Sequence, residues 1–199
     1  MKNIKKIIIV SGSPGSGKST LMKSIKKTNC KIINIGSIME KIGIEKKYID
    51  NRDQIRYLSN DLITELRNYA FDEISKLNGN IIVDTHSSIA ANGRYIPGLP
   101  FESLKKLDNI IGFVYIDADT KDILVRRIRD RTRIRENEDD YLINTQRLIN
   151  LSILSEYTAY LNISLHIINN KQYMFEDAKN KFNKIISDLF HENYKNLKH

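Results

Sequence analysis

The sequence has few of the residues that build special scaffolds: one cysteine, Cys30, three prolines and no tryptophan among 199 residues. A single cysteine excludes an internal disulfide framework and is typical of a reducing compartment, so we predict a cytoplasmic protein. No apolar run approaches the ~18 residues of a membrane span, so no membrane partner is expected. The short apolar run Ile7–Val10 follows basic residues, but a Gly/Ser-rich turn comes directly after it. We therefore interpret this run as a buried strand rather than a signal peptide.

Positive charge exceeds negative charge, with 32 Lys and Arg against 24 Asp and Glu and a formal net charge of +8. The lysines are scattered along the chain, as on an ordinary solvated surface. Six arginines instead fall in one short stretch, at Arg126, Arg127, Arg129, Arg131, Arg133 and Arg135. This clustering predicts a site for a small polyanion, and nucleic acid is not expected as the main partner.

Short apolar runs alternate with stretches of helical spacing. The predicted strands are Lys5–Val10, Lys31–Ile35, Ile81–Val83, Ile110–Ile116 and Leu165–Ile168, and the predicted helices include Lys18–Lys27, Arg52–Leu77, Thr120–Arg129, Tyr141–Tyr160 and Tyr173–Phe190. This alternation predicts an α/β fold with a parallel five-stranded sheet and helices on both faces. The chain shows no internal repeat and no linker, so residues 1–199 are predicted to form a single domain.

The segment after the first predicted strand matches the pattern G-x-x-x-x-G-K-[ST] from Gly12 to Ser19. Its place between a strand and a helix is the context in which this motif forms a phosphate-binding loop, which predicts a fold of the P-loop NTPase type. Backbone N–H groups and the N-terminal end of the helix attract phosphate there. We expect Lys18 to contact the β- and γ-phosphates of ATP and Ser19 to ligate Mg²⁺.

Asp84 ends a predicted strand, where a carboxylate of a P-loop enzyme reaches Mg²⁺. Its alternative role is that of a turn or capping residue. Thr85 follows, where many enzymes that hydrolyse ATP have an acidic base, and its presence favours transfer to a second substrate that needs positioning more than a base. His86 opens a predicted long loop, Thr85–Pro100, close to the reaction centre, and its alternative role is a hydrogen-bond partner within the loop.

Three arginines, Arg131, Arg133 and Arg135, occupy alternate positions in a polar segment and face one direction if that segment is extended. Guanidinium groups bind phosphate oxygens bidentately and keep their charge. We therefore predict a segment that closes over the transferring phosphoryl group and excludes water. A solvated helix end and an RNA-binding patch are the alternatives.

Polar residues between the second and third predicted strands indicate where a phosphoryl acceptor binds. Gly36 permits close approach of the backbone, and Ser37 offers a short donor in the same turn. Arg52 and Arg56 are four residues apart, so they share one face of a predicted helix. They are candidates to hold the phosphate of a second nucleotide, and ordinary surface arginines are the alternative.

Several segments of this sequence, in order, resemble those of the archaeal-type adenylate kinases: VSGSPGSGKST, INIGSIM, NRDQIRYLS, VDTHSSI with GRYIPGLP, and ILVRRIRDRTRIR. The resemblance covers nearly the whole chain, and its VDTHSSI and GRYIPGLP segments are more specific than the P-loop. It implies a nucleoside monophosphate kinase that catalyses the reversible, Mg²⁺-dependent reaction of ATP and AMP to two ADP. It also implies a homotrimer, an AMP-binding segment near residues 36–77 and a lid near residues 130–140.

The motifs and the resemblance together assign a role to each candidate residue. ATP binding is assigned to Gly12, Ser13, Pro14, Gly15, Ser16, Gly17, Lys18, Ser19 and Thr20, catalysis to Lys18, Arg131, Arg133 and Arg135, AMP binding to Gly36, Ser37, Arg56 and His86, and Mg²⁺ to Ser19 and Asp84. Two positions depart from the family pattern, because Ala90 and Leu151 stand where basic residues are common. Both departures remove positive charge that the acceptor phosphate was expected to contact.

Other functions remain open from the sequence. One alternative is another nucleoside monophosphate kinase, in which UMP or CMP replaces AMP as the acceptor. A nucleotide-switched RNA-binding or ribosome-assembly factor is another, since the basic balance and the arginine cluster permit it. A GTPase switch is disfavoured, because Asn170-Lys171 is followed by Gln172 and Tyr173 instead of completing the guanine-binding pattern Asn-Lys-x-Asp.

Overall fold

The computed structural model describes residues 5–25, 29–91, 94–129 and 139–191. The strands of this part of the chain are β1 (Lys6–Gly12), β2 (Cys30–Asn34), β3 (Asn80–Asp84), β4 (Ser88–Ala91), β5 (Arg94–Pro97), β6 (Ile110–Asp117) and β7 (Leu165–Asn169). The helices are α1 (Lys18–Lys23), α2 (Ile35–Glu45), the 3₁₀ helix η1 (Arg52–Tyr57), α3 (Asn60–Ser75), α4 (Phe101–Leu104), α5 (Thr120–Arg129), α6 (Asp140–Leu161) and α7 (Phe175–His191).

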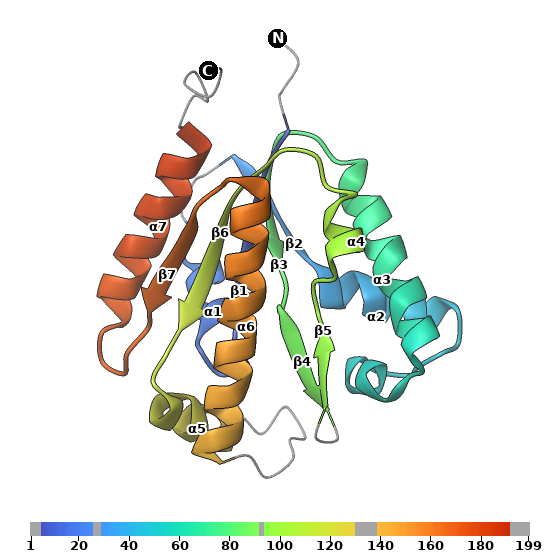
Figure 1. The fold of residues 1–199 in the computed structure, drawn as a ribbon, viewed down its shortest axis with the longest axis horizontal. Coiled ribbons are helices and arrows are strands. Elements are labelled where there is room, and N and C mark those ends of the chain that lie inside the picture. Colours follow the sequence, from blue (N-terminus) through green and yellow to red (C-terminus); the bar gives the residue numbers. More distant parts are fainter. Residues whose placement is uncertain (1–4, 26–28, 92–93, 130–138, 192–199) are drawn as a thin grey trace.

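Five strands form one sheet in the order β2-β3-β1-β6-β7, and all of its pairs are parallel (Figure 1). This arrangement confirms the predicted fold class. The central strand β1 pairs with β3 on one side and with β6 on the other, so the residues that follow β1 lie beside the carboxyl ends of both neighbours. None of the described helices combines the length and the hydrophobicity that a transmembrane span requires.

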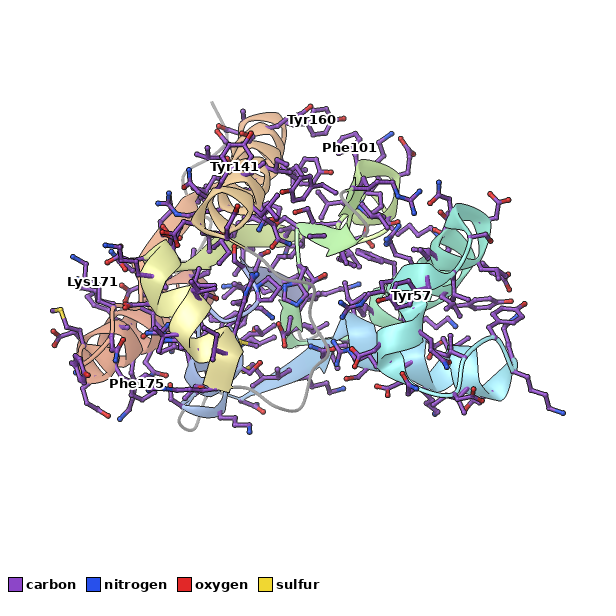
Figure 2. All side chains as sticks on the ribbon, turned by 90° about the horizontal axis from the view of Figure 1, so that it is seen from below. Tyr57, Phe101, Tyr141, Tyr160, Lys171 and Phe175 are labelled. Atoms are coloured by element: carbon purple, nitrogen blue, oxygen red, sulfur yellow. The ribbon has the colours of Figure 1, made fainter. Side chains whose placement is uncertain are left out.

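Alternate residues of β1 enter two separate cores, one on each face of the sheet. Ile7 and Ile9 pack in a cluster with residues of α3 and α6, whereas Ile8 and Val10 pack in a cluster with residues of α1 and α7. Because both faces are covered by helices, the strands are apolar throughout rather than alternating. The short helix α4 docks against α6, where the rings of Phe101 and Tyr160 meet edge to face with their centroids 4.7 Å apart (Figure 2).

The predicted helix Arg52–Leu77 is two helices in the structure. The 3₁₀ helix η1 ends at Tyr57, and α3 begins after Ser59, whose hydroxyl accepts a hydrogen bond from the backbone N–H of Leu62 at 3.4 Å. Leu58 and Ser59 have extended backbone angles, and serine is a favoured N-cap. The single-helix prediction was therefore wrong, because the apolar spacing continues across a break that the capping residue imposes.

The predicted long loop Thr85–Pro100 contains an antiparallel hairpin of β4 and β5, with Ile89 opposite Ile96 and Ala90 opposite Tyr95. The prediction of a loop was wrong for these strands. The sequence did carry a signal for the hairpin, because the dipeptide Asn92-Gly93 between the two strands is typical of two-residue hairpin turns.

Candidate active site

A cleft of about 670 Å³ opens at the carboxyl ends of the parallel strands, the edge at which open α/β sheets bind ligands. Figure 2 looks toward this edge and shows α2 and α3 on one side and α5 on the other. The cationic side chains that line the cleft are Lys18, Arg52, Arg56, Arg67, Arg94, Arg126 and Arg127. Among the described residues, Asp84 is the only carboxylate in the lining. The cleft is therefore built for anions.

The predicted phosphate-binding loop connects β1 to α1 along one wall of the cleft. Seven of its nine predicted residues line the cleft, namely Ser13, Pro14, Gly15, Gly17, Lys18, Ser19 and Thr20. Gly12 and Ser16 belong to the same loop but are not part of that lining. Gly17 caps α1 with φ at 86°, a backbone conformation that favours glycine. A side chain at this position would also collide with the amide of Asn170, which is a second reason for glycine.

Two arginines of α5 donate hydrogen bonds to carbonyls of the loop. Arg126 donates to the carbonyl of Ser16 at 3.2 Å, and Arg127 donates through Nε to the carbonyl of Pro14 at 2.7 Å. Asn170 Nδ2 also donates to the Ser16 carbonyl, at 2.8 Å. The carbonyls of Pro14 and Ser16 in the loop therefore have hydrogen-bond partners in the cleft-lining helix α5 and at Asn170. The first two arginines of the predicted cluster therefore bind the phosphate-binding loop. Arg131, Arg133 and Arg135 lie outside the described residues.

Lys18 and Asp84 form an ion pair at the base of the cleft. Both side chains are buried, and burial lowers the pKa of the Lys18 ammonium, while the Asp84 carboxylate beside it acts in the opposite direction. The second oxygen of Asp84 accepts a hydrogen bond from Asn34 Nδ2 at 2.6 Å. The two residues predicted to act on the phosphates and on Mg²⁺ are therefore brought together, and Ser19 lines the same cleft.

Asn34, which the sequence analysis did not single out, connects the two sides of the site. Its Oδ1 accepts hydrogen bonds from the backbone N–H of Ser37 at 2.9 Å and from Arg52 Nη2 at 3.0 Å. The first bond caps α2, so the predicted turn at Gly36-Ser37 was wrong: both residues lie in the first helical turn. A side chain at Gly36 would meet the guanidinium of Arg52, so the predicted close approach at this glycine is made by Arg52.

The predicted acceptor residues are only partly gathered at the cleft. Gly36, Arg56 and His86 line it, whereas Ser37 does not. Arg56 Nη2 is paired with the Asp53 carboxylate at 3.3 Å, on the same turn of η1. Arg52 and Arg56 both line the cleft.

His86 lies at the end of β3 and turns back to the phosphate-binding loop. Its Nδ1 donates to the carbonyl of Gly12 at 2.9 Å, which leaves Nε2 as an acceptor. Burial, followed by the positive charge of Lys18, lowers the pKa of His86 to about 3. The imidazole is therefore neutral near pH 7, and it contributes hydrogen bonding rather than a positive charge.

The two departures from the family pattern have different surroundings. Ala90 lines the cleft, and the hairpin places Arg94, another lining residue, one pair away from it, opposite Ala91. Arg94 of β5 therefore brings a positive charge to the same cleft that Ala90 lines. Leu151 packs against the core cluster on the α6 side of the sheet instead of lining the cleft.

A buried polar network on α6, also absent from the sequence analysis, holds the lining residues Ser88 and Ser13. Asn150 Oδ1 accepts hydrogen bonds from the backbone N–H of Ser88 at 2.8 Å and from its hydroxyl at 2.7 Å. Gln146 donates to the Ser88 carbonyl at 3.3 Å, and Asn150 Nδ2 donates to Ser13 Oγ at 3.4 Å. The available signal was two amides four residues apart on the face of α6 that also carries buried Leu154.

The family model described as "AAA domain" matches residues 11–143. The chain is 32% identical to the adenylate kinase of Methanothermobacter thermautotrophicus over 184 residues, which cover 91% of this chain and 99% of that relative. It is 34% identical to the adenylate kinase of Pyrococcus horikoshii over 187 residues, which cover 90% of this chain and 94% of that relative.

Solved structures give the same fold. The shikimate kinase of Acinetobacter baumannii in complex with shikimate is similar with a TM-score of 0.61 and 15% identity, covering 94% of this chain and 96% of that one. The shikimate kinase of Bacteroides thetaiotaomicron is similar with a TM-score of 0.56 and 16% identity, covering 92% and 98%. At this identity the likeness concerns the fold alone. The relatives of higher identity, which match nearly their whole length, show that the chain belongs to the archaeal adenylate kinase family.

Proposed function

We propose that this protein transfers the terminal phosphoryl group of ATP to AMP, reversibly, to give two ADP. The observation that carries the proposal is the cationic cleft between a phosphate-binding loop and the arginines of η1. Two nucleotides that enter from opposite sides bring their phosphates together at Lys18, Asp84 and Asn34, where the two walls are linked by hydrogen bonds. The family relatives, which are named adenylate kinases, support the same reaction.

On the donor side, the backbone of Gly12–Thr20 would bind the ATP phosphates. Lys18 would leave Asp84 to place its ammonium on the β- and γ-phosphates. Ser19 and Asp84 offer one hydroxyl and one carboxylate, and no cluster of three His, Cys, Asp or Glu exists among the described residues. This sparse set of oxygen donors fits Mg²⁺, which keeps waters and takes phosphates as ligands, and which supplies neutralisation of phosphate charge when bound.

On the acceptor side, we propose that residues 36–77 bind AMP, with Gly36, Arg56 and His86 at the cleft and Ser37 positioned through the cap of α2. A phosphate oxygen of AMP attacks the γ-phosphorus of ATP, the bond between that phosphorus and the β,γ-bridging oxygen breaks, and its electrons stay on ADP. AMP is already ionised at neutral pH, so the reaction needs alignment more than a general base.

We further propose that Arg131, Arg133 and Arg135 act from a lid near residues 130–140, where they would stabilise the charge of the transferring group. A homotrimer in the cytoplasm remains part of the proposal. Cys30, the one cysteine of the sequence, fits a reducing compartment. Sedimentation of the purified protein measures the oligomeric state, and a monomer at all concentrations contradicts the trimer.

The proposed reaction is tested by supplying AMP, UMP and CMP in turn with Mg²⁺ and ATP and measuring diphosphate formation. We expect AMP to exceed both pyrimidine nucleotides in kcat/KM. Equal rates with the three acceptors would dismiss the assignment of AMP.

A further inference from the structure

Arg67 of α3 is a buried cation with an unsatisfied edge. Only 4% of its surface is exposed. Among the described residues, its Nε and Nη2 are the only buried side-chain nitrogens without a hydrogen-bond partner. These two atoms lie on the same side of the guanidinium and form the fork that donates to paired acceptors. The unsatisfied group is thus one complete bidentate edge.

This arrangement opposes folding. Burial lowers the pKa of Arg67 to about 10, so the guanidinium remains charged near pH 7 and keeps all of its donors. A buried charge without a partner is destabilising, and natural proteins keep such groups mainly where function requires them. Arg67 also lines the cleft, so an arriving ligand can satisfy it.

The charges of the transfer site do not contribute to the pKa shift of Arg67. Lys18 and Arg52 both act on the pKa of His86, and Arg52 acts on that of Lys18, whereas burial is the only cause for the shift of Arg67. The lining of the same cleft includes the apolar residues Met39 and Ile55, which belong to a core cluster with residues of α3. An apolar surface with one directional donor group suits a nucleobase rather than a phosphate.

We propose that Arg67 reads the base of the acceptor nucleotide by donating its Nε–Nη2 edge to the acceptor atoms of a purine, so that GMP is a second acceptor beside AMP. This inference rests on the proposed function. Guanine presents O6 and N7 side by side and pairs with both donors, whereas adenine presents N7 beside an amino group and takes one donation. Both nitrogens are buried while the cleft is empty, so the proposal requires Arg67 to change rotamer when a base binds.

The substitution Arg67→Gln tests the donor pattern. Glutamine pairs with N6 and N7 of adenine, so the variant exchanges the guanine preference of this edge for an adenine preference. Steady-state kinetics at saturating ATP would show that the wild-type protein phosphorylates AMP and GMP. In the variant, the ratio of kcat/KM for AMP to that for GMP would rise by about 10- to 100-fold, mainly through the KM of GMP.

Two further variants separate a binding role from a structural one. Arg67→Met removes the donors and keeps much of the side-chain volume, so it would lower kcat/KM for both purines, leave the KM of ATP unchanged and raise the Tm by about 2–8 °C, because the unpaired charge is gone. Lys76→Met, which removes an exposed cation just after the same helix, would change neither the ratio nor the KM values.

The outcomes are distinguishable. An unchanged ratio of AMP to GMP in Arg67→Gln, or a lowered Tm with unaltered acceptor kinetics in Arg67→Met, overturns the role of Arg67. A wild-type protein that phosphorylates AMP but not GMP overturns this inference alone. A wild-type protein that phosphorylates neither overturns the proposed function as well.

Discussion

The two walls of the cleft are built in different ways. The donor wall is a backbone loop whose carbonyls accept hydrogen bonds from Arg126, Arg127 and Asn170. The acceptor wall consists of side chains, in which Asn34 connects Arg52 to Asp84. A backbone cradle binds any phosphate, whereas a set of side chains selects a particular partner. The donor wall is therefore expected to supply reactivity and the acceptor wall discrimination.

Lys18→Ala is the strongest test of the donor wall. Loss of a cation on the transferring group is expected to lower kcat by about 10⁴-fold, the range found for catalytic cations in phosphoryl transfer. Circular dichroism of the purified variant would check that the fold persists. Lys23→Ala, at the exposed end of the same helix, serves as the matched control. Full activity of the Lys18 variant would remove the loop from the mechanism.

Replacement of Arg133 or Arg135 by alanine tests whether the donor wall depends on the arginines of the proposed lid. We expect kcat to fall by about 10³-fold, because each guanidinium would stabilise charge that develops in the transition state. Arg129→Ala, at the exposed end of α5, controls for the loss of one positive charge. Kinetics equal to those of the control would return the cluster to the solvated-surface interpretation.

Asn34→Ala addresses the connection between the walls. The change removes the amide that links Arg52 to Asp84, so we expect the KM of AMP to rise about 10-fold while the KM of ATP changes little. Asn183→Ala on α7, at a residue that does not line the cleft, is the control. If the two KM values rise equally, Asn34 serves both walls alike, and the division between reactivity and discrimination fails.

Asn150→Leu tests the polar network between α6 and Ser88. The substitution leaves the N–H and hydroxyl of Ser88 without their acceptor, which is expected to cost about 1–3 kcal/mol in the free energy of unfolding. Urea unfolding measures this loss. A variant as stable as the wild-type protein would mean that water or a neighbouring group replaces the amide.

His86 makes the stability of the fold depend on pH. Its pKa is about 3 in the folded state and about 6.5 when unfolded, so below pH 6.5 the unfolded chain takes up a proton that the folded chain refuses. Stability is therefore lost as pH falls from 6.5 toward 3, by at most about 1.4 kcal/mol per unit, and His86 contributes nothing above that window. His86→Asn should flatten this decline in urea titrations, and parallel profiles would contradict it.

The parts of the molecule that the sequence predicted are those with local causes. The P-loop is one contiguous pattern, and the sheet follows from apolar runs that both faces bury, so neither needed long-range information. Hairpin β4–β5 was missed although Asn92-Gly93 marks it, because its strands are short and contain two alanines. The position of the break after η1 depended on a single capping serine, Ser59.

The rest of the site depends on contacts between distant segments. Asn34 and Asp84 are 50 residues apart and meet only because β2 and β3 pair in register. Arg67 looks like a surface arginine in the sequence, and its burial follows from the packing of α2 on α3. Asn150 acts on Ser88 across 62 residues. Such couplings are properties of the tertiary structure, and no window along the chain contains both partners.

The ion pair of Lys18 with Asp84 has a consequence for how the empty protein is loaded. Each of the two groups neutralises the other while no nucleotide is present. The base of the cleft is therefore expected to bind free anions or free cations only weakly. A phosphate can take the ammonium only by separating the pair, and the separated carboxylate then becomes available to a cation. Anion and cation therefore gain most when they arrive together, as a metal–nucleotide complex does.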